Sequence, residues 1–214
     1  MNKNNPGLFI SFEGVEGSGK STQAKMAADA LTKEGRPVVL TAEPGGTPIS
    51  QAIREVLLDS SHGAMEPVTE LLLYAAARRQ HLYELILPAL DEGKVVITDR
   101  FSDSTSAYQG AGRGLEMGLI AELDRMVTGG LKPDLTLIFD IDVEEGLMRN
   151  RGAGKRDRLE LEDVEFHKRV REGFLDIANN EPERVKIVQV SGDKDEVHEK
   201  VMAVIKGVMD PIYL

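Results

Sequence analysis

Cysteine is absent from this chain of 214 residues, which excludes disulfide bonds and thiolate metal sites. Long apolar runs are absent too, since none approaches the roughly 20 residues that a membrane-spanning helix needs. The opening residues, MNKNNPGLF, contain neither an apolar signal core nor a small-residue cleavage site. These absences predict a cytoplasmic protein without a membrane partner.

Positive charge is scarce. Lys and Arg number 26 against 36 Asp and Glu, which gives a formal net charge of −10. A protein that binds nucleic acid normally presents a basic face or stripe, so we expect no nucleic-acid partner. If the ligand is a phosphate compound, the cations that bind it must be gathered at one site within an acidic surface.

Five apolar, β-branched runs alternate with segments of helical periodicity. Such runs are typical of parallel strands covered on both faces, and the alternation predicts an α/β fold. No repeat or linker divides the chain, so we expect one domain over residues 1–214, with a five-stranded parallel sheet and helices on both faces. The runs lie at 8–13, 37–42, 95–99, 135–141 and near 185, and the clearest helical segments at 21–33, 66–90 and 194–209.

Residues 14–21, GVEGSGKS, match the phosphate-binding pattern G-x-x-x-x-G-K-[ST] in full. The glycines let successive backbone N–H groups turn toward phosphate oxygens, while Lys20 supplies charge for the β- and γ-phosphates. Ser21 offers a hydroxyl to Mg²⁺, and the next helix adds the positive end of its dipole. The alternative is a glycine-rich turn that only caps a helix. The predicted ATP-binding residues are Gly14, Val15, Glu16, Gly17, Ser18, Gly19, Lys20, Ser21 and Thr22.

The motif alone leaves three classes open: GTP-hydrolysing switches, ATP-driven motors and small-molecule kinases. A switch would carry an N-K-x-D guanine-reading motif after a later strand, and an ABC-type ATPase would carry an LSGGQ-like helix start. Neither occurs in the sequence. The kinase class is therefore favoured, with a nucleotide-dependent switch or motor as the alternative.

Four segments resemble bacterial thymidylate kinases, in the order and at the spacing of that family. They are FEGVEGSGKST at 12–22, TAEPGGTPIS at 41–50, LLLYAAARRQH at 71–81 and TDRFSDSTSAYQGAGRG at 98–114. The resemblance implies a P-loop NTPase three-layer fold and transfer of the ATP γ-phosphate to dTMP, giving dTDP for dTTP synthesis and DNA replication. It also implies Mg²⁺ as cofactor and a homodimer. A kinase for another monophosphate, such as uridylate, is the nearer alternative.

The resemblance further implies an acceptor site. Tyr74, where most relatives carry phenylalanine, would stack on thymine, and Arg78 would reach a base carbonyl. Tyr108 would pack against the sugar 2′ carbon, and Glu16 would contact the 3′ hydroxyl. Read singly, such residues are more often core aromatics or solvated charges. The expected substrate-binding set is Glu16, Glu43, Pro44, Arg54, Tyr74, Arg78, Arg100, Thr105, Tyr108 and Gln109.

Arg100 and Asp99 end the third predicted strand, beside the phosphate loop. An arginine there can fork onto phosphate oxygens, and a strand-end aspartate commonly manages Mg²⁺ and its waters. A structural ion pair is the alternative. In the family this arginine joins the two substrates. The expected metal-site residues are Ser21, Glu13 and Asp99, and the expected catalytic residues are Lys20, Arg100, Arg151 and Arg156.

Arg151 and Arg156 belong to a basic segment, residues 149–158, which we interpret as a mobile loop. Together with the DRLE motif at 157–160 it resembles the lid of the family, over about residues 149–160. The chain departs from most relatives at Ala42 and Ala153, where arginine is usual, and at Arg156, where leucine is usual. The choice between the two lid arginines is left open. The histidines lack metal-ligand spacing and are expected to have no catalytic role: His62, His81, His167 and His198.

Overall fold

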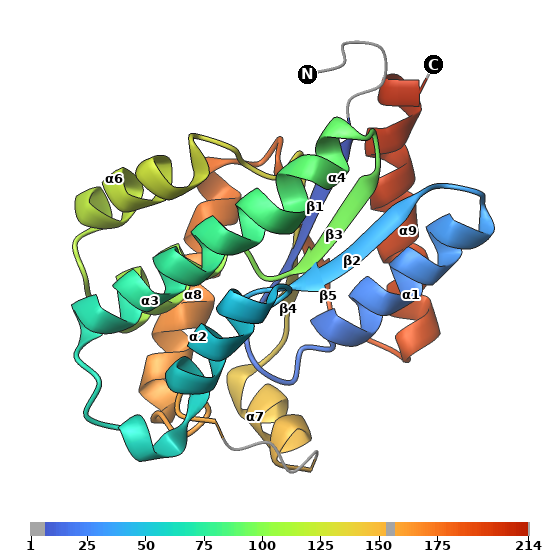
Figure 1. Cartoon of the computed structure of the whole chain (residues 1–214). Coiled ribbons are helices and arrows are strands. Elements are labelled where there is room, and N and C mark those ends of the chain that lie inside the picture. The colour runs from blue at the N-terminus through green and yellow to red at the C-terminus, as the bar shows by residue number, and fades with distance from the viewer. Residues whose placement is uncertain (1–6, 153–156, 214) are drawn as a thin grey trace.

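The computed structural model describes residues 7–152 and 157–213. Five parallel strands form one sheet in the order β2-β3-β1-β4-β5 (Figure 1). The predicted α/β class, the number of strands and their parallel arrangement are confirmed. The strands are β1 Leu8–Glu13, β2 Val38–Ala42, β3 Val95–Asp99, β4 Leu135–Asp140 and β5 Val185–Gln189.

Helices cover both faces of the sheet (Figure 1). They are α1 Lys20–Lys33, α2 Pro48–Leu58, α3 Pro67–His81, α4 Leu87–Asp91, α5 Ser102–Thr105, α6 Met117–Thr128, α7 Val143–Gly152, α8 Val164–Asn180 and α9 Lys194–Tyr213. α1 and α9 pack on one face, and α4 and α8 on the other. β1 and β4 are buried along their whole length because both faces are covered, which explains their mainly apolar sequences. Within the described ranges, no helix is long and apolar enough to cross a bilayer.

The helix predicted over residues 66–90 contains a change of winding. α3 passes into a π-helical segment, η2 Leu82–Ile86, and then into α4. Pro88 has no N–H to offer the carbonyl of Glu84, and its ring would crowd that carbonyl in an α-helix. The wider π turn before the proline relieves this conflict. Two further short segments are a 3₁₀ turn, η1 Ser60–His62, and a second π-helical segment, η3 Ser106–Gly112.

The carboxyl ends of three neighbouring strands meet at one edge of the sheet. The register places Asp99 of β3 beside Phe12 of β1 on one side and beside Ala42 of β2 on the other. The residues that follow these strands are therefore brought together: the phosphate loop after β1, Glu43 after β2 and Arg100 after β3. Ligands of open parallel sheets bind at such an edge.

The interpretation of residues 149–158 as a loop is wrong for its first part. α7 continues to Gly152, and within it Arg149 pairs with Glu145 one turn earlier, at 2.6 Å. The Asp142 side chain accepts the N–H groups of Glu144 and Glu145 and so caps the start of this helix. Arg156 lies outside the described residues, and only the backbone of Arg151 is described.

The phosphate loop and α7 approach each other through two glycines. A Cβ atom on Gly17 would lie 1.9 Å from the carbonyl oxygen of Gly146, and one on Gly146 would lie 2.5 Å from the carbonyl oxygen of Glu16. Both separations are far shorter than van der Waals contact. The conformation of the loop therefore depends on the absence of side chains at both positions.

We predict that Gly146→Ala pushes α7 away from the phosphate loop and lowers the free energy of unfolding by about 1–3 kcal/mol, the usual cost of overpacking. ATP affinity should fall as well, because the displaced backbone carries Glu16 and Gly17. The matched control is Gly207→Ala in α9, where a Cβ atom meets nothing within 4 Å. Alanine there should be neutral or stabilise the helix by up to about 1 kcal/mol. Urea unfolding and calorimetric titration with ATP measure both effects, and wild-type values for Gly146→Ala would contradict the packing argument.

Candidate active site

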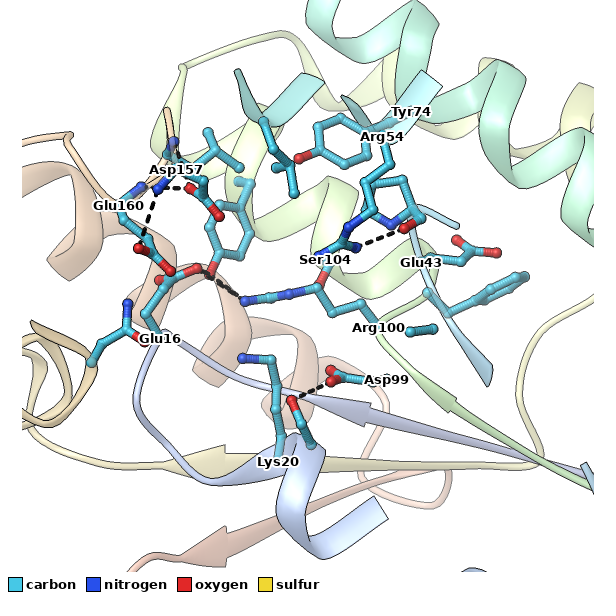
Figure 2. Close-up of a pocket in the computed structure, with 18 of the residues that line it drawn as sticks. Glu16, Lys20, Glu43, Arg54, Tyr74, Asp99, Arg100, Ser104, Asp157 and Glu160 are labelled. Atoms are coloured by element: carbon cyan, nitrogen blue, oxygen red, sulfur yellow. Dashed lines mark hydrogen bonds and ion pairs between the residues drawn. The ribbon is translucent and has the colours of Figure 1, made fainter. Parts of the chain in front are cut away.

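A cleft of about 770 Å³ opens at the carboxyl edge of the sheet (Figure 2). Its walls come from the phosphate loop, the ends of β2 and β3, helices α2 and α3, η3, and the segment 157–160. Most of the residues expected from the sequence line it. They are Glu16, Gly17, Gly19, Lys20, Ser21, Thr22, Glu43, Pro44, Arg54, Tyr74, Arg78, Asp99, Arg100, Thr105, Tyr108 and Gln109.

Other phosphate-loop residues support the loop from behind the cleft wall. Gly14, with φ 135°, passes so close to β4 that a Cβ atom would lie 2.6 Å from the carbonyl oxygen of Phe139. Val15 is buried in the apolar cluster beneath the loop, and Ser18 is buried as well. Gly19 adopts φ 83° directly before α1 begins at Lys20. The positive N-terminal end of α1 therefore adjoins the cleft, as an anion site requires.

Lys20 is the cation of the phosphate loop. Its Nζ donates to the carbonyl of Val15 at 3.3 Å, and its side chain is largely buried in the cleft wall. Burial lowers the pKa of this ammonium to about 8, and the charge of Arg100 adds to the lowering, while Asp99 and Glu16 oppose it. A ligand with negative charge would restore the ordinary protonation of Lys20.

Ser21 and Asp99 form the part of the site that suits a hard cation. The Ser21 hydroxyl donates a short hydrogen bond to Asp99 Oδ2. Asp99 Oδ1 is buried and has no hydrogen-bond partner in the described part of the chain. Oxygen donors of this kind, together with phosphate oxygens and water, are what Mg²⁺ prefers.

Glu13, expected at the metal site, lies beneath the cleft and is not among the residues that line it. The carboxylate is fully buried. Its Oε1 accepts from the N–H of Phe101 at 2.6 Å and from the Ser11 hydroxyl at 2.7 Å, and its Oε2 accepts from the Ser104 hydroxyl at 2.5 Å. Burial, together with the nearby Asp103, raises its pKa to about 7. Glu13 therefore anchors the turn that carries Arg100.

Arg100 occupies the centre of the cleft. Its φ of 76° is left-handed, a strained conformation for a residue with a side chain, and its N–H donates to the carbonyl of Phe12. The guanidinium donates to the carbonyl of Gly14 and to Ser104 Oγ, each at 3.1 Å. Figure 2 shows it reaching toward Glu16, with Lys20 and Asp99 on one side and Tyr74 on the other. Arg100 thus lies between the phosphate loop and the opposite wall.

Glu16 and Tyr108 hold the far end of Arg100. Arg100 donates to Glu16 Oε1 and to the Tyr108 hydroxyl at 3.0 Å each, and Tyr108 donates to Glu16 Oε1 at 2.6 Å. The guanidinium also lies over the Tyr108 ring, 4.8 Å from its centre. Burial works against ionisation of Glu16, but the nearby His167 and the charges of Arg100 and Lys20 hold its pKa well below the ordinary value. The Glu16 carboxylate is therefore ionised at neutral pH.

Arg78 is fixed by partners from three elements. Its Nε donates to Glu43 Oε2 at 2.8 Å, and one terminal nitrogen donates to Thr105 Oγ1 at 2.9 Å and to the carbonyl of Phe101. His81, fully buried, lies 3.0 Å from Glu43 Oε1 and steadies that carboxylate from behind.

Tyr74 lies one turn before Arg78 on α3, where burial and the Glu70 carboxylate raise the pKa of its phenol. Arg54 donates to the carbonyl of Pro44 at 2.7 Å.

Glu70 was not expected to take part in the site. This fully buried carboxylate accepts from Gln109 Nε2 at 2.8 Å and from Arg113, and it pairs with Arg158 at 2.5 Å. Arg158 also donates to the carbonyl of Leu57. The segment 157–160 is thereby tied to α2 and α3, and Asp157, Leu159 and Glu160 line the cleft. No local sequence signal joins position 70 to position 158, which is why reasoning from spacing missed this cluster.

Comparisons with known proteins gave matches for both the sequence and the fold. The sequence profile of a family described as thymidylate kinase matches residues 12–201. A thymidylate kinase of Geotalea uraniireducens is 51% identical over 205 residues, covering 93% of this chain and 96% of the relative. That of Bacillus licheniformis is 50% identical, covering 94% and 95%. A crystal structure of thymidylate kinase from Ehrlichia chaffeensis superposes with a TM-score of 0.78 at 37% identity, covering 94% of this chain and all of that one.

The lowered pKa of Lys20 predicts a pH dependence of ATP affinity. In the free protein Lys20 is charged below pH 8 and neutral above it, and ATP phosphates favour the charged form. Affinity should therefore be flat below about pH 7 and fall up to ~10-fold per pH unit above pH 8, with proton uptake on binding. Lys20→Arg is the matched control, because its guanidinium stays charged throughout. Calorimetric titration in buffers of different ionisation enthalpy measures both quantities; identical profiles for the two proteins would contradict the lowered pKa.

Proposed function

The chain belongs to the thymidylate kinase family and is a kinase that transfers the γ-phosphate of ATP to dTMP, and we propose that the cleft described above holds both substrates. The observation that carries this proposal is the convergence of Lys20 and Arg100 in one cleft. Lys20 belongs to the phosphate loop, which suits ATP. Arg100 faces the opposite wall, formed by Tyr74, Arg78 and Tyr108, which suits a pyrimidine nucleotide. The phosphates of the two substrates would meet between these two cations.

On the ATP side, the β- and γ-phosphates would lie against Lys20 and the backbone N–H groups of the phosphate loop. Mg²⁺ would be held by Ser21 and Asp99, because the buried and unpaired Asp99 Oδ1 leaves an oxygen donor available beside the serine hydroxyl. When bound, Mg²⁺ neutralises charge on the phosphate oxygens. Glu13 supports this side only through the turn that carries Arg100.

On the acceptor side, the dTMP phosphate would lie near Arg100 and Arg54, and the thymine base near Tyr74 and Arg78. Thr105 and Gln109 would read the pyrimidine edge, although the Gln109 amide already donates to Glu70 and leaves mainly its oxygen available. Tyr108 and Glu16 would meet the sugar, at its 2′ carbon and its 3′ hydroxyl. Glu43 and Pro44 complete this wall, with Glu43 orienting Arg78.

The transfer needs no covalent enzyme intermediate. An oxygen of the dTMP phosphate attacks the γ-phosphorus in line, and the new P–O bond forms as the bond to the bridging oxygen of ADP breaks, leaving ADP and dTDP. Lys20 and Arg100 neutralise charge on the transferring group and keep the two substrates aligned. We propose that the enzyme is cytoplasmic, that it supplies dTDP for dTTP synthesis and DNA replication, and that it does not bind nucleic acid.

The proposal also includes a lid over about residues 149–160 within a single domain of residues 1–214. Glu16 leaves the phosphate loop without an arginine of its own, so further positive charge would come from Arg151 or Arg156. Arg149 and Asn150, at the end of α7, line the cleft and bring the chain to the place where such an arginine is needed. Lid closure would exclude water and limit wasteful ATP hydrolysis.

A homodimer is supported by exposed apolar side chains on α3, η2 and α6. Four of these side chains are exposed, and two of them, Tyr83 and Met126, are exposed by 69% and 72%; the other two are Leu72 and Leu119. The helices α3 and α6 pack against each other. A second copy of this chain would cover them. Patches of this kind mark interfaces more often than isolated exposed apolar residues do.

A coupled ADP-release assay over a panel of nucleoside monophosphates tests the proposed function. We expect little ADP release without an acceptor and the highest kcat/KM with dTMP. Lys20→Ala should lower kcat by roughly 10²-fold or more, because a preorganised charge on the phosphates is lost. ADP release independent of any acceptor would indicate a switch or motor instead, and a preference for UMP would reject dTMP as the acceptor.

Steady-state kinetics test the lid. Arg151→Ala or Arg156→Ala should lower kcat strongly with the KM for dTMP nearly unchanged, since an arginine that meets the phosphates only on closure acts on the transition state. Lys168→Ala is the control, because Lys168 is an exposed cation paired with Glu165 outside the cleft. Wild-type kcat in both single variants and in the double variant would contradict a catalytic role of the lid. Arg100 alone would then have to supply the additional positive charge at the transferring phosphate.

Sedimentation equilibrium tests the dimer. The wild-type mass should be about twice the 23.4 kDa of one chain. The double variant Leu72→Glu, Met126→Glu should sediment as a monomer, because a desolvated carboxylate opposes burial of the patch. Met148→Glu changes an equally exposed side chain on α7 and should remain dimeric. A monomeric wild type would reject the pairing.

A further inference from the structure

His167 lies directly behind Glu16, on an element that spacing in the sequence did not connect with the phosphate loop. Its side chain is fully buried on α8, and its Nδ1 is 3.4 Å from Glu16 Oε2. Neither ring nitrogen has a hydrogen-bond partner among the described residues, and Glu16 Oε2 has none either. A movement of a few tenths of an ångström would bring Nδ1 within ordinary hydrogen-bond distance of that oxygen.

The position of His167 is fixed by close packing of α8 on η3. A Cβ atom on Gly173 of α8 would lie 2.7 Å from the Cβ of Ala111, and one on Gly112 would lie 2.7 Å from the ring of Phe166. The Phe166 ring also meets the His167 ring edge-on, with centres 5.4 Å apart. These contacts therefore fix α8, and with it the backbone of His167, against η3.

The two oxygens of Glu16 have different surroundings. Oε1 accepts from Arg100 and from the Tyr108 hydroxyl, whereas Oε2 faces only His167 within the part of the chain that is described. The terminal torsion of a glutamate is broad and roughly two-fold, so one set of donors leaves the carboxylate plane poorly fixed. A donor on the second oxygen would fix it. A neutral imidazole with its proton on Nδ1 is such a donor.

We infer that His167 is a positioning residue, which donates Nδ1–H to Glu16 Oε2 and so orients the Glu16 carboxylate toward the sugar 3′ hydroxyl of the acceptor. This inference rests on the proposed function for the place of the acceptor, and it adds a residue that touches neither substrate. It follows that the 3′ hydroxyl contributes to binding only while His167 holds the carboxylate. A hydrogen bond to a charged group contributes about 1.5–3 kcal/mol, or roughly 10- to 100-fold in affinity.

Calorimetric dissociation constants for dTMP and for 3′-deoxythymidine monophosphate test the inference. In the wild type, loss of the 3′ hydroxyl should weaken binding by roughly 10-fold or more. In His167→Phe, which keeps a ring against Phe166 but has no donor, dTMP should bind at least about 10-fold more weakly and the two acceptors about equally. His167→Asn offers an amide N–H near the place of Nδ1 and should recover much of the preference. His198→Phe, on α9 away from the cleft, is the control and should behave as wild type.

Kinetics and stability separate this role from a purely structural one. The KM for dTMP should rise in His167→Phe while kcat and the KM for ATP change by less than about 3-fold, because the contact is with a non-reacting part of the acceptor. A His167→Phe protein that keeps the wild-type preference for the 3′ hydroxyl overturns the inference, and so does an equal loss of preference in the Phe and Asn variants. A wild type that binds dTMP without phosphorylating it would reject the proposed function, while the dissociation constants would still decide the role of His167.

Discussion

The turn after β3 is the constraint on which the rest of the site depends. Arg100 has a left-handed backbone at the point where β3 ends, and the N–H of the next residue, Phe101, is held by the buried carboxylate of Glu13. A left-handed backbone at a residue with a side chain costs of order 1–3 kcal/mol, and it persists only where the surrounding structure fixes it. Here Glu13, Ser104 and the carbonyl of Phe12 fix it. The guanidinium thereby lies between the phosphate loop and the opposite wall, formed by Tyr74, Arg78 and Tyr108.

The cleft shows how an acidic protein gathers positive charge at one site. Three arginines in or beside it are held by a carboxylate from another element: Arg100 by Glu16, Arg78 by Glu43, and Arg158 by Glu70. A buried charge is costly unless it is paired, and pairing also fixes the direction of the guanidinium. The net charge of −10 therefore coexists with a cleft that gathers Lys20, Arg54, Arg78 and Arg100. His81 behind Glu43, and His167 behind Glu16, extend this arrangement by one more layer.

Local patterns in the sequence predicted the sheet and the phosphate loop, and the resemblance to the thymidylate kinase family supplied most of the other cleft residues. Five mainly apolar runs correspond to the five parallel strands, because a sheet covered on both faces needs few polar positions within its central strands. Long-range pairing was not predictable. Glu13 ends a strand, where a metal ligand is often found, yet its carboxylate accepts hydrogen bonds from Ser11, Ser104 and Phe101. The pairs of Glu70 with Arg158 and of Glu16 with His167 span elements whose juxtaposition only the folded chain reveals.

The most direct test of the central role of Arg100 is kcat/KM for dTMP in Arg100→Lys. Lysine keeps the positive charge but cannot donate at once to the carbonyl of Gly14, to Ser104, to Glu16 and to Tyr108. Arg54→Lys is the matched comparison, because Arg54 lines the same cleft and, among the described residues, donates one hydrogen bond, to the carbonyl of Pro44. We expect a fall of roughly 10²-fold or more for Arg100→Lys and less than about 10-fold for Arg54→Lys. A near-wild-type value for Arg100→Lys would contradict the account.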